Sequence, residues 1–127
     1  MADTVYVVDT GLAITTNRIK GTGTEPAYVG WGTGATTAAV GNTGLQTPAA
    51  EARTAGTTSQ QTTTTTGDTY RNVATITCTG AGKAITEVCM FDASTNGNCF
   101  LRGTFDAINV SVGDSIQFTI NTVFNQA

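Results

Sequence analysis

Two glycine-rich stretches of the sequence have residue types that could bind a phosphate group. Residues 30–34 (GWGTG) have the glycine density of a phosphate-binding loop. Their spacing differs from the dinucleotide-binding fingerprint, and no crossover helix is predicted to follow. Residues 80–83 (GAGK) end in a Gly-Lys pair, but Ala84 follows where such a loop needs serine or threonine. We therefore expect residues 30–34 to form a structural bend after a strand, and we predict no nucleotide cofactor.

A third stretch, residues 92–97 (DASTNG), could bind a metal ion, because it matches the opening of a calcium-binding EF-hand loop. The twelfth position of that loop is Gly103 instead of glutamate, and no helix is predicted on either side. The pair Asn96-Gly97 tolerates positive φ, so the stretch favours a hairpin turn. We predict no bound metal here.

The cysteines Cys78, Cys89 and Cys99 could bind zinc or form a disulfide. Their spacing contains no CxxC, and the sequence has no histidine, so a zinc site is not expected. Cys78 and Cys89 lie in apolar runs, where a reduced cysteine behaves as a small hydrophobic residue. We expect buried free thiols; one disulfide with one thiol left over is the alternative.

Glu87 is the only acid within the apolar run of residues 84–91 (AITEVCMF). It could be a buried acid with a raised pKa. We expect instead that it pairs with an arginine or accepts hydrogen bonds from backbone N–H groups at a bend, with Arg71 and Arg102 as the candidate partners. Without histidine, the usual base for a serine or cysteine nucleophile is missing, and no two carboxylates converge as glycoside hydrolysis requires. The sequence therefore predicts that the protein is not an enzyme.

The composition indicates one all-β domain. The chain has 127 residues, 28 of them threonine, and only 12% are charged. This length suits one domain with a real core. Threonine favours strands because its branched side chain packs well on a pleated surface. A surface with so few charges is typical of proteins that pack permanently against neighbours.

The charge pattern excludes several classes of partner. The net charge is −3, and the six basic residues are scattered, so no patch could neutralise several phosphates of a nucleic acid. We find no run of eighteen apolar residues and no positively charged start before an apolar core. The sequence therefore predicts neither a membrane span nor a signal peptide, and it predicts synthesis in the cytoplasm.

Short runs rich in β-branched residues predict about eight strands between glycine-containing turns. The runs cover residues 4–8, 12–16, 27–31, 55–66, 73–78, 85–91, 99–101 and 115–124. Alternation is clearest in the last run, where Ile116, Phe118 and Ile120 share a face and are predicted to be core. Residues 45–53 are the one plausible helix, with an extended segment as the alternative.

These elements predict an all-β fold, an antiparallel β-sandwich or a jelly-roll-like sandwich. Residues 68–105 are expected to form a three-stranded meander whose apolar face is covered by a second sheet. We divide the chain into an N-terminal arm or edge strand over residues 1–26 and a β-sandwich domain over residues 27–127. The arm is predicted to be extended.

Several blocks of the sequence resemble a group of small virion proteins of tailed bacteriophages. The blocks are YVGWGTGATTAAVGNTGL with PAAEAR, then TYRNVATIT, then ITEVCMFDASTNGNCFLRGTF followed by VGDSIQFTI, and together they lie between residues 27 and 124. The resemblance implies that Tyr28, Trp31, Arg53, Glu87, Phe91, Asp92 and Asp114 are fold-defining positions. It implies no active site.

The resemblance implies a structural role, first of all that of a capsid decoration (cement) protein. Such a protein binds the outer surface of the phage head as a homotrimer and clamps neighbouring subunits of the major capsid protein. The alternative is a tail or fibre accessory protein with a receptor- or carbohydrate-binding role. The residues that we expect at the interface with partners are Val5, Tyr6, Val7, Tyr28, Trp31 and Arg53.

Overall fold

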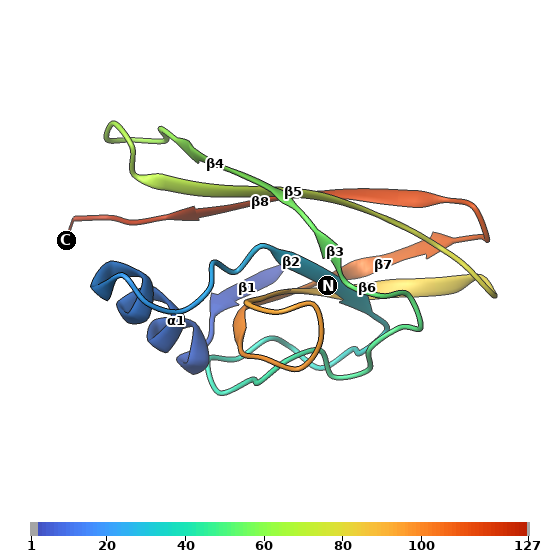
Figure 1. Ribbon diagram of the computed structural model, residues 1–127. Helices are drawn as coiled ribbons and strands as arrows, with labels where there is room; N and C mark the ends of the chain where they lie inside the picture. Colours follow the sequence, from blue (N-terminus) through green and yellow to red (C-terminus); the bar gives the residue numbers. More distant parts are fainter. Residues whose placement is uncertain (1–2, 127) are drawn as a thin grey trace.

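The computed structural model describes residues 3–126 and shows two antiparallel sheets packed face to face (Figure 1). The elements are β1 (Thr4–Val7), α1 (Asp9–Lys20), β2 (Tyr28–Gly32), β3 (Thr54–Ala55), β4 (Thr57–Gln61), β5 (Thr69–Thr77), β6 (Lys83–Phe91), β7 (Cys99–Val110) and β8 (Ser115–Val123). Sheet A has the strand order β1-β7-β6-β2-β3, and sheet B has the order β4-β5-β8. The predicted all-β sandwich is confirmed.

The predicted meander is divided between the two sheets. β6 and β7 are neighbours in sheet A, whereas β5 pairs with β4 and β8 in sheet B. The link between β5 and β6 therefore crosses from one sheet to the other. Two backbone hydrogen bonds hold the start of this link to the turn that precedes β8: Cys78 N–H donates to Asp114 O, and Gly113 N–H donates to Cys78 O. The alternation of a strand tells which residues share a face but not which sheet the strand joins, so the sequence pattern could not show this division.

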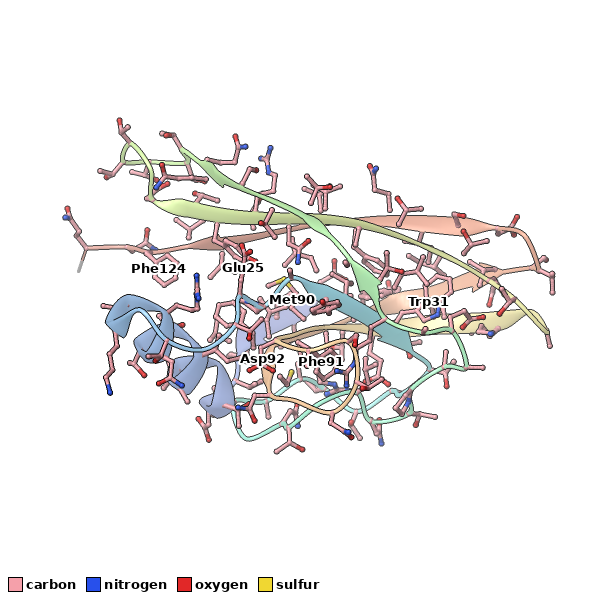
Figure 2. The ribbon with its side chains drawn as sticks, viewed as in Figure 1. Glu25, Trp31, Met90, Phe91, Asp92 and Phe124 are labelled. Carbon is pink, nitrogen blue, oxygen red and sulfur yellow. The ribbon has the colours of Figure 1, made fainter. Side chains whose placement is uncertain are left out.

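The two sheets differ in how they are buried. β6 is buried almost continuously from Ile85 to Phe91, because both faces of sheet A are covered. β8 alternates between exposed and half-buried residues, because the outer face of sheet B meets solvent. The main core, which contains Trp31, Ile85 and Leu101, fills the space between the sheets, and a smaller cluster of Val8, Cys89, Phe91 and Cys99 lies in a separate group. Figure 2 shows Trp31 and Met90 between the two sheets.

The N-terminal segment folds back onto the sandwich. β1 pairs with β7 of the same chain as the edge strand of sheet A, so an extended arm is not confirmed. Residues 12–16 belong to α1, so the strand predicted there is wrong. Gly21 ends this helix with a φ of 90°, and its N–H donates to Arg18 O. Gly11 allows the helix to approach β7 closely, since a Cβ at this position would overlap the carbonyl oxygen of Phe100.

Two further expectations are corrected in the middle of the chain. The structure has no helix over residues 45–53; the segment is irregular and forms a bridge between Pro48 and Gly32. The strand expected over residues 55–66 ends with β4 at Gln61. The threonines that follow form a loop in which the Asp68 carboxylate accepts hydrogen bonds from the N–H groups of residues 63–65. These bonds lower the pKa of Asp68.

All three cysteines are buried free thiols, which confirms the preferred prediction. Cys89 and Cys99 lie together in the smaller cluster. The hydrogen bond with Cys99 and burial both raise the pKa of the Cys89 thiol, so this thiol is protonated at neutral pH.

We expect the substitution Phe118→Ala to lower the free energy of unfolding by about 3–5 kcal/mol, as large-to-small changes in a core do. Phe118 is half-buried, and its ring lies 6.4 Å from that of Trp31 and 6.1 Å from that of Phe105, between ring centroids. Its partial exposure places the effect toward the lower end of that range. Thermal denaturation measures it, with Gln117→Ala on the exposed face of the same strand as the control. An unchanged midpoint for the Phe118 variant would contradict the assignment of this face to the core.

Candidate functional site

Two irregular segments cover the outer face of sheet A (Figure 1). They are residues 33–53, which connect β2 to β3, and residues 92–98, which connect β6 to β7; together we call them the loop layer. Figure 2 shows Phe91 and Asp92 on this side of the sheet. The loop layer contains residues 92–97 and the last two residues of the stretch 30–34, and it contacts the side chains of Glu87 on β6 and Arg102 on β7.

A buried ion pair holds the longer segment onto the sheet. The Glu87 and Arg102 side chains are 0% and 1% exposed, and Arg102 Nη2 lies 3.0 Å from Glu87 Oε1. Glu87 also accepts hydrogen bonds of 2.8 Å from the N–H groups of Gly34, Gln46 and Thr47. Both parts of the prediction for Glu87, an arginine partner and backbone donors, are therefore confirmed, with Arg102 as the partner.

Arg102 extends the same network to the first half of the longer segment. Its Nη1 donates to Asn42 Oδ1 at 3.0 Å, and its Nη2 donates to Thr36 O at 3.1 Å. Burial alone would raise the pKa of Glu87, but the backbone hydrogen bonds and Arg102 outweigh burial and lower it. Glu87 is therefore a permanent anion that positions the loops, which contradicts the alternative of a raised pKa.

The glycines of residues 30–34 make room for the Glu87 network and do not form a phosphate-binding loop. A Cβ at Gly32 would overlap Thr47 O, and a Cβ at Gly34 would lie 2.5 Å from Glu87 Oε2. Only glycine lets the chain pass this close to the carboxylate. The expectation of a structural bend after the strand agrees with this geometry.

A second carboxylate, Glu51, ties the loop layer to the link between the sheets. It accepts hydrogen bonds of 2.8 Å from Trp31 Nε1 and Thr79 N–H, and it forms an ion pair of 2.5 Å with Lys83 Nζ. Burial opposes ionisation, but the bonds from Lys83, Thr79 and Trp31 outweigh it and lower the pKa of Glu51 to about 2. Sequence reasoning missed this role, because the partners of Glu51 are distant from it in the sequence.

These lowered pKa values predict acid sensitivity. The pKa of Glu51 falls from 4.5 to about 2 on folding, so its stabilising effect is complete above pH 4.5 and is lost as the pH falls toward 2. Glu87 contributes in the same direction. We expect the thermal midpoint to decrease over this range, and to decrease less in Glu51→Gln. An equal decrease in both proteins would contradict this account.

Arg53 holds the shorter segment of the loop layer. Its guanidinium carbon lies 3.4 Å from the ring centroid of Phe91, and its Nη1 donates to Ala93 O at 2.9 Å and to Asn96 O at 2.7 Å. Burial lowers the pKa of Arg53, although arginine remains charged. Asn96 has a φ of 54°, and Gly97 has a φ of 69°, so the predicted turn is confirmed.

A cavity of about 690 Å³ opens between the two segments of the loop layer. Its lining includes Arg53, Arg102 and Glu51 and the neutral polar residues Thr36, Asn42, Thr43, Gln46, Ser94, Thr95 and Asn96. Among residues 3–126 no cluster of three or more potential metal ligands exists. The cavity is the strongest candidate for a binding site.

A second cavity, of about 450 Å³, lies between α1 and the open end of the sandwich. Ile14, Ile19, Tyr70 and Phe124 contribute to its apolar lining. Figure 2 shows Phe124 and Glu25 at this end. Burial raises the pKa of Tyr70, and the nearby Glu25 raises it further.

The predicted interface residues are spread over the molecule. Val5 and Tyr6 are exposed on edge strand β1, and Val7 packs against the main core. Trp31 is buried between the sheets, Tyr28 packs on the smaller cluster, and Arg53 lines the larger cavity. The fold therefore does not bring these six residues into one surface.

Comparison with known proteins gives one family. A family model described as "Podophage GP4 fiber I protein gp80" matches residues 7–125. No curated protein and no solved structure matches the chain. In the part that the structure describes, no helix is long and apolar enough to cross a membrane.

Proposed function

Because the chain belongs to the family of the podophage GP4 fiber I protein gp80, and is thus a structural protein of a bacteriophage virion, we propose that it is a subunit of a virion fibre. The observation that carries this proposal is the extent of the family match, which includes α1, the loop layer and every strand from β2 to β8. The fibre role was the alternative in the sequence analysis. It now takes precedence over capsid decoration.

The proposed role is non-catalytic, with other virion proteins and further copies of this chain as partners. The chain has no histidine to act as a base, and the buried carboxylates Glu87 and Glu51 are engaged in ion pairs that hold loops. Neither nucleic acid nor membrane is a proposed partner. Receptor or carbohydrate binding at the fibre is part of the proposal.

Capsid decoration is the second candidate, supported by the resemblance of the sequence blocks to small virion proteins. In that role the protein would bind the major capsid protein on the outer surface of the head. A homotrimer is proposed for either role. The exposed edge strand β1 favours such self-association, because the unpaired backbone groups of an edge strand can pair with another chain.

Electron microscopy of virions labelled with an antibody to this protein distinguishes the two roles. Label on fibres is the expected result. Label at regular positions over the head would overturn the fibre role and support capsid decoration. Disassembled particles separated into heads and fibres provide an independent check by immunoblot.

The role of β1 in self-association can be tested without unfolding the domain. Removal of residues 2–20 is unsuitable, because Val8 and Ile14 within this range are 0% and 3% exposed and belong to the core. The double variant Val5→Lys, Tyr6→Lys instead places two charges on the exposed edge. Sedimentation analysis should show a trimer for the wild type and for the control Thr119→Lys, and a monomer for the double variant. A double variant that remains trimeric would contradict the role of this edge.

A further inference from the structure

Arg53 lines the cavity of the loop layer and has unused hydrogen-bond donors. A guanidinium has five N–H donors in a planar fork. The two donors on Nη1 bind Ala93 O and Asn96 O, whereas those on Nε and Nη2 have no hydrogen-bond partner among residues 3–126. The Phe91 ring beneath the guanidinium fixes its plane. The Nε–Nη2 edge is therefore held ready for a ligand that accepts two parallel hydrogen bonds.

Arg53 forms no ion pair with another residue of the described chain. The other two charged residues of the lining are paired, Glu51 with Lys83 and Arg102 with Glu87. Asp92 is close enough to attract Arg53 electrostatically, but within the described chain it forms no ion pair with it, and its Oδ1 accepts a hydrogen bond from Asn98 N–H. The cavity thus has a local positive charge on a protein whose net charge is −3. This arrangement favours an anion.

The rest of the lining favours a ligand rich in hydroxyl groups. Thr43, Ser94 and Thr95 line the cavity, and their hydroxyls make no hydrogen bond within residues 3–126. The centre of a protein–protein interface is typically apolar and aromatic. Here the one aromatic residue of the lining, Phe91, is covered by Arg53. The hydroxyl groups of a sugar can both donate to and accept from such neutral side chains, and its C–H groups can pack on Leu45 and Pro48.

The loops that form the cavity are fixed before any ligand binds. Glu87 holds residues 34, 46 and 47, Arg102 holds Asn42, and Arg53 holds the turn at residues 93–96. Preorganised loops reduce the entropy lost on binding. The volume of about 690 Å³ lies within the range of roughly 300–1,000 Å³ that is usual for small-molecule sites.

We propose that this cavity binds a saccharide that carries a carboxylate, with Arg53 binding the carboxylate and the hydroxyls of Thr43, Ser94 and Thr95 binding the sugar. The inference deepens the receptor- or carbohydrate-binding part of the proposed fibre role. It rests on that proposed role, whereas its test uses the isolated protein and does not depend on the position of the protein in the virion.

Calorimetric titration of the full-length protein tests the proposal with three acidic probes: tetragalacturonate, a hyaluronan tetrasaccharide and sialyllactose. We expect at least one probe to bind, and neutral maltotetraose to bind at least about tenfold more weakly, as expected when charge-assisted hydrogen bonds are lost. Arg53→Gln should weaken binding of the acidic probe by about tenfold or more, and Arg53→Lys should restore part of it. Arg71→Gln, on sheet B, is the matched control and should bind as the wild type does.

A second variant tests the cavity without altering the contacts of Arg53. Thr95→Trp fills the space from an exposed position and should abolish binding while the thermal midpoint stays unchanged. If none of the three acidic probes binds, or if Arg53→Gln and Thr95→Trp bind as tightly as the wild type, the proposal is wrong. Equal affinity for tetraglutamate would overturn the saccharide as ligand and indicate an acidic protein segment. Immunolabelled fibres together with a protein that binds no saccharide would overturn this inference alone.

Discussion

Replacement of Glu87 by glutamine is expected to lower the free energy of unfolding by about 3–5 kcal/mol, as is usual when one partner of a buried ion pair is removed. The substitution keeps the size of the side chain but leaves the Arg102 guanidinium, 1% exposed, without a counter-charge. The N–H groups of Gly34, Gln46 and Thr47 also lose a charged acceptor. The loop layer should therefore loosen before the sandwich unfolds.

Urea unfolding at neutral pH measures the effect, and amide hydrogen exchange locates it. Faster exchange is expected at residues 34, 46 and 47, which donate to Glu87, while exchange at the centre of β8 should change less. The control is the double variant Glu87→Met, Arg102→Met, which removes both charges and should be destabilised less than the sum of the two single variants. A loss below about 1 kcal/mol for Glu87→Gln would show that the pair contributes little to holding the loops.

The sequence predicted the sandwich because its strongest signal, the alternation in residues 115–124, depends only on local geometry. Ile116, Phe118 and Ile120 do pack against the main core. The division of the meander between two sheets depends on long-range pairing, and the alternation of β5 is the same in either sheet. This part of the topology therefore could not be read from the pattern.

The helix α1 shows how packing overrides local propensity. Ile14, Thr15 and Thr16 are β-branched and predict a strand, and the helix buries only Gly11 and Ile14. The helical conformation follows from the close contact of Gly11 with β7 and from the left-handed cap at Gly21. Neither signal is evident in a sequence where glycine is also the common turn residue.

The candidate site was only partly predictable. Glu87 was identified because an acid in an apolar run needs a partner, but the choice between Arg71 and Arg102 required the topology. Arg71 lies on sheet B and bonds with Asn121, whereas Arg102 lies on β7, next to the strand of Glu87. The cavity arises between loops that are distant in sequence, so no local pattern could indicate it. The role of Glu51 could not be predicted for the same reason, because its partners are distant in sequence.

Trp31→Ala is expected to be as damaging as the loss of Glu87, with a decrease of about 3–5 kcal/mol in the free energy of unfolding. Trp31 is 1% exposed, and its ring lies 6.4 Å from that of Phe118, between ring centroids, so the substitution leaves a cavity between the two sheets. Its Nε1 donates to Glu51, so the link to the loop layer is lost as well. Because a domain is stabilised by only about 5–15 kcal/mol, this variant could fail to fold.

Trp31→Phe keeps the prediction testable in that case. It retains an aromatic ring in the core but removes the donor to Glu51, which still binds Thr79 and Lys83. We expect a loss of about 1–2 kcal/mol by urea unfolding, close to the value of one hydrogen bond with a small volume change. The sequence predicted that Trp31 contacts partners, and that role makes the opposite prediction, a loss of self-association with normal stability. Sedimentation and unfolding measured on the same Trp31→Phe sample therefore separate the two roles. A stable protein that no longer forms its oligomer would contradict the assignment of Trp31 to the core. A destabilised protein that still associates would support that assignment.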